Sequence, residues 1–227
     1  MTGYLQGSTR PEISMASHQC ARFVTHPKRS HERAMIRLVR YLKSTSSRGI
    51  IYDPQPEKGL ECFVDADFAG GWTQADADNA EQVMSRTGFV IRYAGCPIGW
   101  CSKLQSEIAL STAEAEYIAL SQALREVIPL VSLIDELGGV FDLHVDTPNF
   151  VVKVWEDNQS CIAMAESTKF SPRTKHIALK YHHFKQFQDS GRINVQYVNT
   201  EDQLADILTK PLNDPAFFKL RRMLMGW

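Results

Sequence analysis

The amino-acid sequence predicts an α/β protein in which helices pack on the faces of one mixed sheet. Three strand-like segments follow one another between residues 59 and 104 with short links, which is typical of an antiparallel meander. Two further strand-like segments alternate with helical ones in the rest of the chain, giving the order βββαβαβα. Of the 227 residues, 44% are hydrophobic and 22% are charged, a composition that is rich enough in apolar residues to form a core.

The first 58 residues are predicted to form a basic, helical segment that ends in a linker. Helices are expected over residues 11–25 and 30–44, with Ser30 as the N-cap of the second. Apolar residues recur in that second helix at helical spacing, and the other side carries three arginines, Arg33, Arg37 and Arg40. Residues 44–58 are rich in Ser, Gly and Pro, and they are expected to hold one short strand within the linker.

Residues 59–212 are expected to form the sheet domain. Its strands are predicted at GLECFVDA, GFVIRY, IGWCSK, VVKVW and INVQYV. A long helix is expected over about 112–137, kinked by Pro129 and ended by Gly138 and Gly139.

The end of the chain is predicted to contain two helices. Thr200 and Gln203 have the spacing of a capping box, which predicts a helix over roughly 201–209 that Pro211 closes. An amphipathic helix over 214–225 is then expected to form a separate C-terminal element, residues 213–227.

Composition and charge narrow the functional classes. No apolar run approaches the roughly 20 residues of a membrane span, so no membrane partner is expected. The five cysteines include no CxxC pair, which favours free thiols in a reducing compartment. Residues 1–60 carry ten Lys and Arg against four acids, a net charge of +6, whereas the remainder has −7. This asymmetry fits a polyanion-binding element beside a cation-binding one, and it equally fits two differently solvated surfaces.

Acidic residues at the ends of regular elements are the candidates for chemistry. Asp65 and Asp157 each follow an apolar strand, Glu114 and Glu116 lie in the first turns of the long helix, and Asp206 lies in the capped helix. Buried carboxylates that come together repel one another unless cations bind between them. Oxygen ligands without His or Cys favour Mg²⁺ or Mn²⁺, and two such ions about 4 Å apart can clamp a phosphodiester.

Each acid also has a structural explanation. Asp157 fits the N-cap of the helix that follows it, and Asp206 fits a solvated surface position. Glu114 and Glu116 both favour the helix dipole, and periodicity does not choose between them because they lie on opposite sides of the apolar stripe. Spacing therefore leaves open whether the acids converge.

Several longer stretches resemble one known family. VDADFAG, SRTGFVI, PIGWCSKLQSEIALSTAEAEYIAL, WEDNQSCIAMAES, SPRTKHIALKYHHF and VNTEDQLADILTKPL occur in the order found in the ribonuclease H domain of copia-type LTR retrotransposon Pol polyproteins. Together they cover nearly all of residues 60–212. Residues 8–52 resemble the segment that joins the reverse transcriptase to that domain, so 1–58 is expected to be its C-terminal remnant or connection.

The resemblance implies a ribonuclease H-like fold, with a five-stranded mixed sheet flanked by helices, and a metal site with four acids. Matched motif by motif, the catalytic metal ligands are Asp65, Glu116, Asp157 and Asp206, holding two Mg²⁺ or Mn²⁺ ions. The implied reaction is endonucleolytic hydrolysis of the RNA strand of an RNA/DNA hybrid. The implied partners are that hybrid and the reverse transcriptase portion of the same polyprotein. The residues expected to contact nucleic acid are Arg173, Lys175 and His176, with Arg33, Arg37 and Arg40 as a second, basic face.

Two alternatives remain. The chain has no Y-x-D-D polymerase motif and is not expected to polymerise DNA, so it is either part of a larger reading frame or a truncated remnant that binds nucleic acid without cleavage. An integrase-like nuclease is a weaker reading because four acids match rather than three. The resemblance places the protein in the cytoplasm, within the element's virus-like particle, with the nucleus as the alternative.

Overall fold

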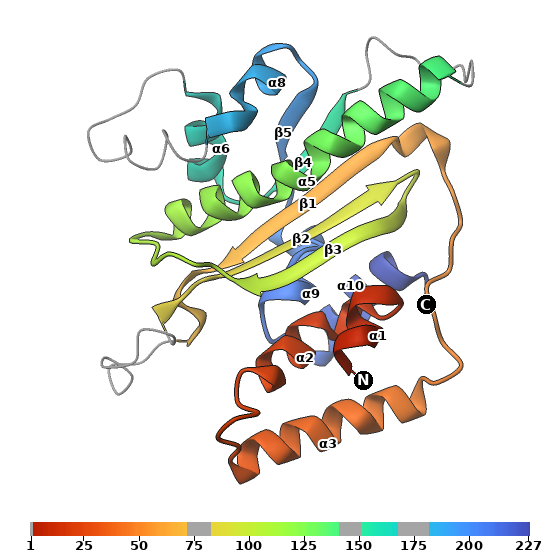
Figure 1. Cartoon of the computed structure of the whole chain (residues 1–227), viewed down its shortest axis with the longest axis vertical. Helices are drawn as coiled ribbons and strands as arrows, with labels where there is room; N and C mark the ends of the chain where they lie inside the picture. The colour runs from red at the N-terminus through yellow and green to blue at the C-terminus, as the bar shows by residue number, and fades with distance from the viewer. Residues whose placement is uncertain (1, 72–82, 141–150, 168–181) are drawn as a thin grey trace.

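A computed structural model of the chain, which describes residues 2–71, 83–140, 151–167 and 182–227, contains one five-stranded sheet (Figure 1). The strand order is β3-β2-β1-β4-β5. Strands β1 to β3 pair antiparallel, whereas β1–β4 and β4–β5 pair parallel. The predicted mixed sheet is confirmed, and its strands are β1 (Leu60–Asp67), β2 (Arg86–Tyr93), β3 (Cys96–Leu104), β4 (Val152–Glu156) and β5 (Ile193–Tyr197).

Strand β1 is central, and its side chains alternate between two hydrophobic cores. Cys62 and Val64 belong to the core beneath the long helix, whereas Phe63 belongs to the core on the other face. Alternation of side chains along a strand gives this division directly. Asp65 shares the side of Phe63, and it lies at the end of the strand where both β1 and its parallel neighbour β4 finish.

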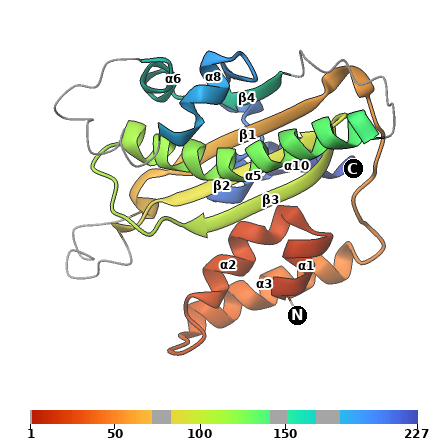
Figure 2. The same cartoon turned by 45° about the horizontal axis from the view of Figure 1, so that its top comes forward.

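One face of the sheet is covered by the long helix α5 (Thr112–Val140), with α6 (Gln159–Glu166) and α8 (Lys185–Asp189) beside it (Figure 2). Helix α5 continues through Pro129, Gly138 and Gly139, so the predicted end at the glycines was wrong. Both glycines lie in the last turn of the helix, which ends at Val140. Helix α5 is long and apolar enough to span a membrane, but core helices of globular proteins share that property, and half of its apolar window is buried here.

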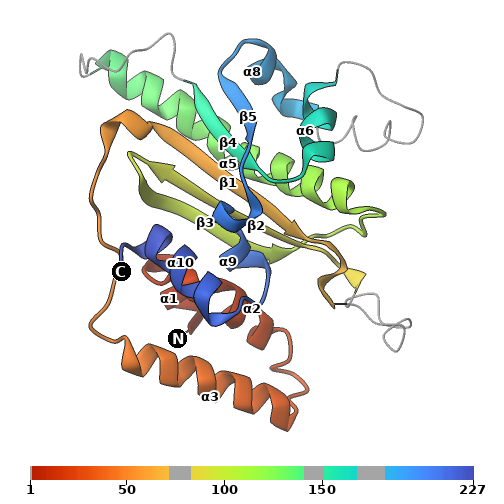
Figure 3. The same ribbon diagram turned by 180° about the vertical axis from the view of Figure 1, so that it is seen from behind.

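The other face is covered by α9 (Asp206–Thr209) and α10 (Asp214–Met225) together with the N-terminal helices (Figure 3). Helix α2 (Ser14–Ala21) contacts β3 and α9, and α3 (Arg29–Ser44) packs on α2. The first helix, α1 (Thr2–Ser8), was not predicted. The N-cap of α3 is Lys28, two residues before the predicted Ser30, and the His31 ring nitrogen accepts the backbone N–H of Lys28 at 3.0 Å.

The linker before β1 contains no strand, so that prediction was also wrong. Its amides bond to isolated acceptors: Ile51 donates to the carbonyl of Met225 at 2.9 Å, and Gln55 donates to that of Ala94 at 2.7 Å. A strand requires a neighbouring strand edge with a continuous row of partners. The linker instead crosses from α3 to β1, and ends in a single 3-10 turn at Pro56–Lys58.

Candidate metal and nuclease site

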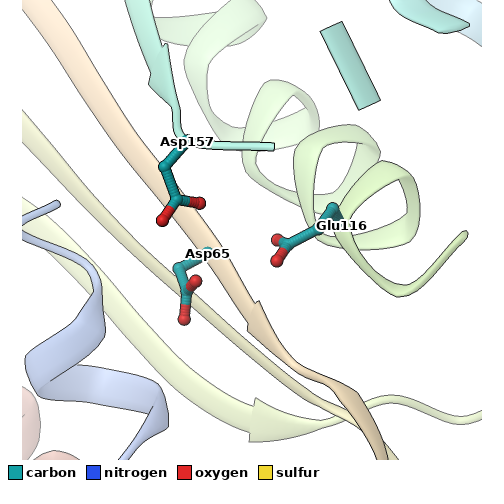
Figure 4. A group of neighbouring side chains, drawn as sticks. All are labelled: Asp65, Glu116 and Asp157. Atoms are coloured by element: carbon teal, nitrogen blue, oxygen red, sulfur yellow. The ribbon is translucent and has the colours of Figure 1, made fainter. Parts of the chain in front are cut away.

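Three of the four predicted acids meet at one edge of the sheet. Ligand oxygens of Asp65, Glu116 and Asp157 all lie within 4.8 Å of one another. They come from three elements, β1, α5 and the residue after β4, and Asp157 and Glu116 direct their carboxylates into the space beside Asp65 (Figure 4). Asp65 is fully buried and Glu116 is 4% exposed.

Asp65 lies opposite a glycine, which lets helix α9 approach the sheet closely. In the antiparallel register Asp65 pairs with Gly88 of β2. A Cβ atom placed on Gly88 would lie 2.5 Å from Cγ2 of Thr209 and 3.0 Å from Cβ of Leu208. The hydroxyl of Thr209 donates a hydrogen bond to Oδ2 of Asp65. The absence of a side chain at Gly88 therefore brings α9, with Asp206 at its start, against the end of β1.

The structure chooses between the two glutamates of α5. Oε2 of Glu114 accepts the backbone N–H of Leu110 at 2.8 Å, so Glu114 serves the start of the helix. Glu116 lies two residues further along, on the opposite side of the helix, and faces the acids, and its Oε2 has no hydrogen-bond partner in the described part of the chain. Burial first, and then the negative charges of Asp65, Glu156 and Asp157, raise the pKa of Glu116 well above its usual value.

Asp157 is not the N-cap of the helix that follows it. Asn158 takes that role, because its Oδ1 accepts the amides of Ser160 at 2.9 Å and Cys161 at 3.1 Å. The Asp157 carboxylate is thus left to face the cluster. The hydroxyl of Thr200 donates to Oδ2 of Asp157 at 2.8 Å and fixes its orientation.

The predicted capping box at Thr200 does not form. Thr200 donates to Asp157, while the fully buried Gln203 donates to the carbonyl of Val64 at 2.9 Å. The expected helix over 201–209 is accordingly split into a 3-10 turn at Thr200–Asp202 and the short α9. Tertiary hydrogen bonds to the ends of β1 and β4 replace the local ones that the spacing suggested.

Asp206, the fourth predicted acid, reaches Asp65 through a lysine. Nζ of Lys210 lies 2.9 Å from Oδ1 of Asp65 and 2.9 Å from Oδ1 of Asp206. Burial, and then the charge of Asp65, raise the pKa of Asp206 to about 7, although Lys210 opposes the change. Burial acting alone lowers the pKa of Lys210, but the two carboxylates outweigh it and raise that pKa above its ordinary value.

The sequence reading missed two charged residues of the site, Lys210 and Glu156. Glu156 is fully buried next to Asp157, and its Oε1 accepts the amide of Asn158 at 3.1 Å. Burial chiefly raises the pKa of Glu156 well above normal. The sequence contained an indication of each residue. Lys210 follows Asp206 at the i, i+4 spacing of a helical ion pair, and Glu156 points to the same buried side of its strand as Val152 and Val154.

The structure does not bring the predicted basic face to this cluster. Arg33, Arg37 and Arg40 are exposed on α3, which lies on the outer side of α2 (Figures 1 and 3). Arg173, Lys175 and His176 lie outside the described residues.

The carboxylate cluster fits a divalent cation. Three oxygen donors within reach of one ion, without His or Cys, are the ligands that Mg²⁺ and Mn²⁺ prefer. The buried, unpartnered Oε2 of Glu116 is costly unless a cation satisfies it.

Comparison with known proteins agrees with the resemblance found in the sequence. The chain is 34% identical over 209 residues to a retrovirus-related Pol polyprotein from transposon RE1 of Arabidopsis thaliana, which covers 92% of this chain and 13% of the relative. It is 35% identical over 225 residues to the Pol polyprotein from transposon TNT 1-94 of Nicotiana tabacum, which covers 98% of this chain and 15% of that relative. No family model matches.

Among solved structures, LC11-RNase H1 in complex with an RNA/DNA hybrid aligns with a TM-score of 0.42 and 19% identity, over 66% of this chain and 93% of that one. The chain spans only 13% to 15% of the polyproteins that it matches, at 32% to 35% identity over most of its own length. By sequence the chain is a homologue of one segment of the retrovirus-related Pol polyproteins of transposons.

Proposed function

We propose that the chain is a metal-dependent endoribonuclease that hydrolyses the RNA strand of RNA/DNA hybrids as part of a retrotransposon polyprotein. The observation that carries the proposal is the meeting of Asp65, Glu116 and Asp157 within 4.8 Å, with Asp206 joined to Asp65 through Lys210. These are the four positions that the family resemblance assigns to metal binding. Buried carboxylates that come together repel one another, and a bound cation removes that repulsion.

The residues of the cluster have different roles in the proposed site, and their hydrogen bonds support these roles. Asp65, Glu116 and Asp157 would hold the first divalent ion, and Asp65 with Asp206 offers a position for the second. When bound, such ions supply Lewis-acid stabilisation of the phosphodiester and lower the pKa of water. Thr200 and Thr209 position Asp157 and Asp65 by donating to one oxygen of each, which leaves the other oxygens for the ion or for Lys210.

The proposal is tested by cleavage of a labelled RNA/DNA hybrid with Mg²⁺ or Mn²⁺. We expect cleavage by the unaltered chain and none by Asp157→Asn, which keeps the shape of the side chain and removes its charge. Asp202→Asn is the matched control, because Asp202 is an exposed acid that pairs with Lys219 at 2.8 Å, away from the cluster. Full activity in Asp157→Asn would rule the site out.

The second candidate is a truncated remnant that binds nucleic acid without cutting it. Hybrid binding by the unaltered chain without cleavage in either metal would select this reading. The Arg33→Ala, Arg37→Ala, Arg40→Ala triple variant tests the remaining interface, because loss of phosphate contacts weakens binding and flattens its salt dependence. Unchanged hybrid affinity in that variant would show that α3 does not contact the hybrid.

A further inference from the structure

Lys210 occupies a defined position within the acidic cluster. Its Nζ lies 2.9 Å from both Asp65 and Asp206, and its backbone N–H donates to the carbonyl of Asp206 at 3.0 Å. The side chain is only one-third exposed. Since both ends of the residue are fixed by hydrogen bonds, Lys210 is a built part of the site rather than a surface lysine.

The ammonium group lies between Asp65 and Asp206, the two acids that the proposed function assigns to a second metal ion. A two-ion site needs cations about 4 Å apart that share a carboxylate. Asp65 is the acid common to two groups: its ligand oxygen lies within 4.8 Å of those of Glu116 and Asp157, and it shares Nζ of Lys210 with Asp206. Nζ of Lys210 occupies the space between Asp65 and Asp206, so a divalent ion cannot bind in that space while the ammonium group remains there.

Within the parts of the chain that are described, the negative charges of Glu116 and Asp157 are not neutralised by a paired lysine as those of Asp65 and Asp206 are. Glu116 and Asp157 have no ion pair within the described ranges, and Oε2 of Glu116 has no hydrogen-bond partner there. The first cation position is thus prepared for an ion, while Lys210 neutralises the second position internally.

We propose that Lys210 is a built-in monovalent cation that takes the second cation position, so that the free chain binds one divalent ion per site. Binding of a second ion between Asp65 and Asp206 then requires Lys210 to withdraw toward solvent. The inference rests on the proposed function for the identity of the first ion, but it concerns stoichiometry rather than cleavage.

The test is a Mn²⁺ titration of the full chain without nucleic acid, followed by calorimetry and electron paramagnetic resonance. We expect one bound Mn²⁺ with the spectrum of an isolated ion. Lys210→Met, which keeps the length of the side chain without its charge, should bind two ions and show spin coupling between them. Lys219→Met is the matched control, since Lys219 also pairs with an aspartate, and it should still bind one ion.

Further variants separate the possible outcomes. Adding Asp206→Asn to Lys210→Met should return the number of bound ions to one, and Lys210→Gln serves as a second variant if the Met variant does not unfold cooperatively. Two ions in the unaltered chain, or only one in a folded Lys210 variant, would overturn the role of Lys210 and leave the proposed nuclease intact. No bound Mn²⁺ in the unaltered chain would overturn both.

Discussion

Strand β1 carries two buried acids on the same side, Glu61 and Asp65, and they have opposite surroundings. Glu61 lies opposite Arg92 and pairs with it at 2.8 Å, while its other oxygen accepts the indole N–H of Trp155 at 3.1 Å. Asp65 lies opposite Gly88, which supplies no cation, and its neighbours include three more acids. Each oxygen of Glu61 therefore has a partner, whereas the acids around Asp65 outnumber Lys210, the one lysine paired with them among the residues that the structure describes.

This contrast distinguishes a buried acid that stabilises the fold from a group of buried acids suited to binding a cation. A buried acid with a matched cation and satisfied oxygens contributes to the fold, and removing one partner is costly. A cluster with excess negative charge destabilises the metal-free fold and gains stability from a bound cation. The two ends of β1 should thus respond to mutation in opposite ways.

The largest expected effect is on cleavage by Glu116→Gln. Loss of one ligand to the first ion should lower kcat/KM for the hybrid by about 1,000-fold, or roughly 4 kcal/mol. The same change removes a repelling charge, so the free energy of unfolding in EDTA should stay equal or rise. Urea unfolding measures the second quantity, and a marked loss of stability would mean that Glu116 is structural, like Glu61.

The complementary change at the other end is Glu61→Gln. It leaves Arg92 buried without its partner and should cost about 3–5 kcal/mol of unfolding free energy. Cleavage per folded molecule, measured well below the unfolding transition, should be unchanged. A large fall in specific activity would show that the two ends of β1 are coupled and that the comparison fails.

A smaller effect is expected at Thr200, which orients Asp157 without belonging to the cluster. Thr200→Val removes the donor and should weaken Mn²⁺ binding roughly tenfold, as for other residues that position metal ligands. Thr200→Ser keeps the hydroxyl and should retain the affinity. Calorimetry provides the measurement, and equal affinities in both variants would remove Thr200 from the site.

A further effect is expected on the pH dependence of stability without metal. The pKa of Asp206 is raised from 3.8 to about 7, chiefly by burial, so the folded chain holds this proton more tightly than the unfolded chain. Its contribution to stability is fully present below the unfolded value and is lost as the pH rises through about 7. The free energy of unfolding in EDTA should therefore fall as the pH rises, and Asp206→Asn should make that decline shallower. Saturating Mn²⁺ should reverse the trend, because the metal binds the deprotonated acids.

Local pattern predicted the five strands and the longer helices, and the family motifs identified the four acids. Alternation and helical periodicity predicted the five strands, α5 and α10 in their correct order, and motif matching selected Glu116 before any geometry was available. Local rules failed where tertiary contacts intervened: Thr200 and Gln203 hydrogen-bond to Asp157 and to the carbonyl of Val64 rather than to each other. Such contacts join residues that are 43 and 139 positions apart, which no local rule detects.

The amino-acid sequence determined which ionisable residues are available. It also determined most of the segments that become strands and helices, because the spacing of apolar residues follows the period of each element. Whether the four acids meet at one site was decided only by the tertiary structure. Gly88 had to face Asp65 across the sheet for α9 to approach, Asn158 had to take the cap that Asp157 could have filled, and Lys210 had to fold back between two acids. The physical reason is that charge interactions depend on distance and burial, and packing alone fixes these quantities.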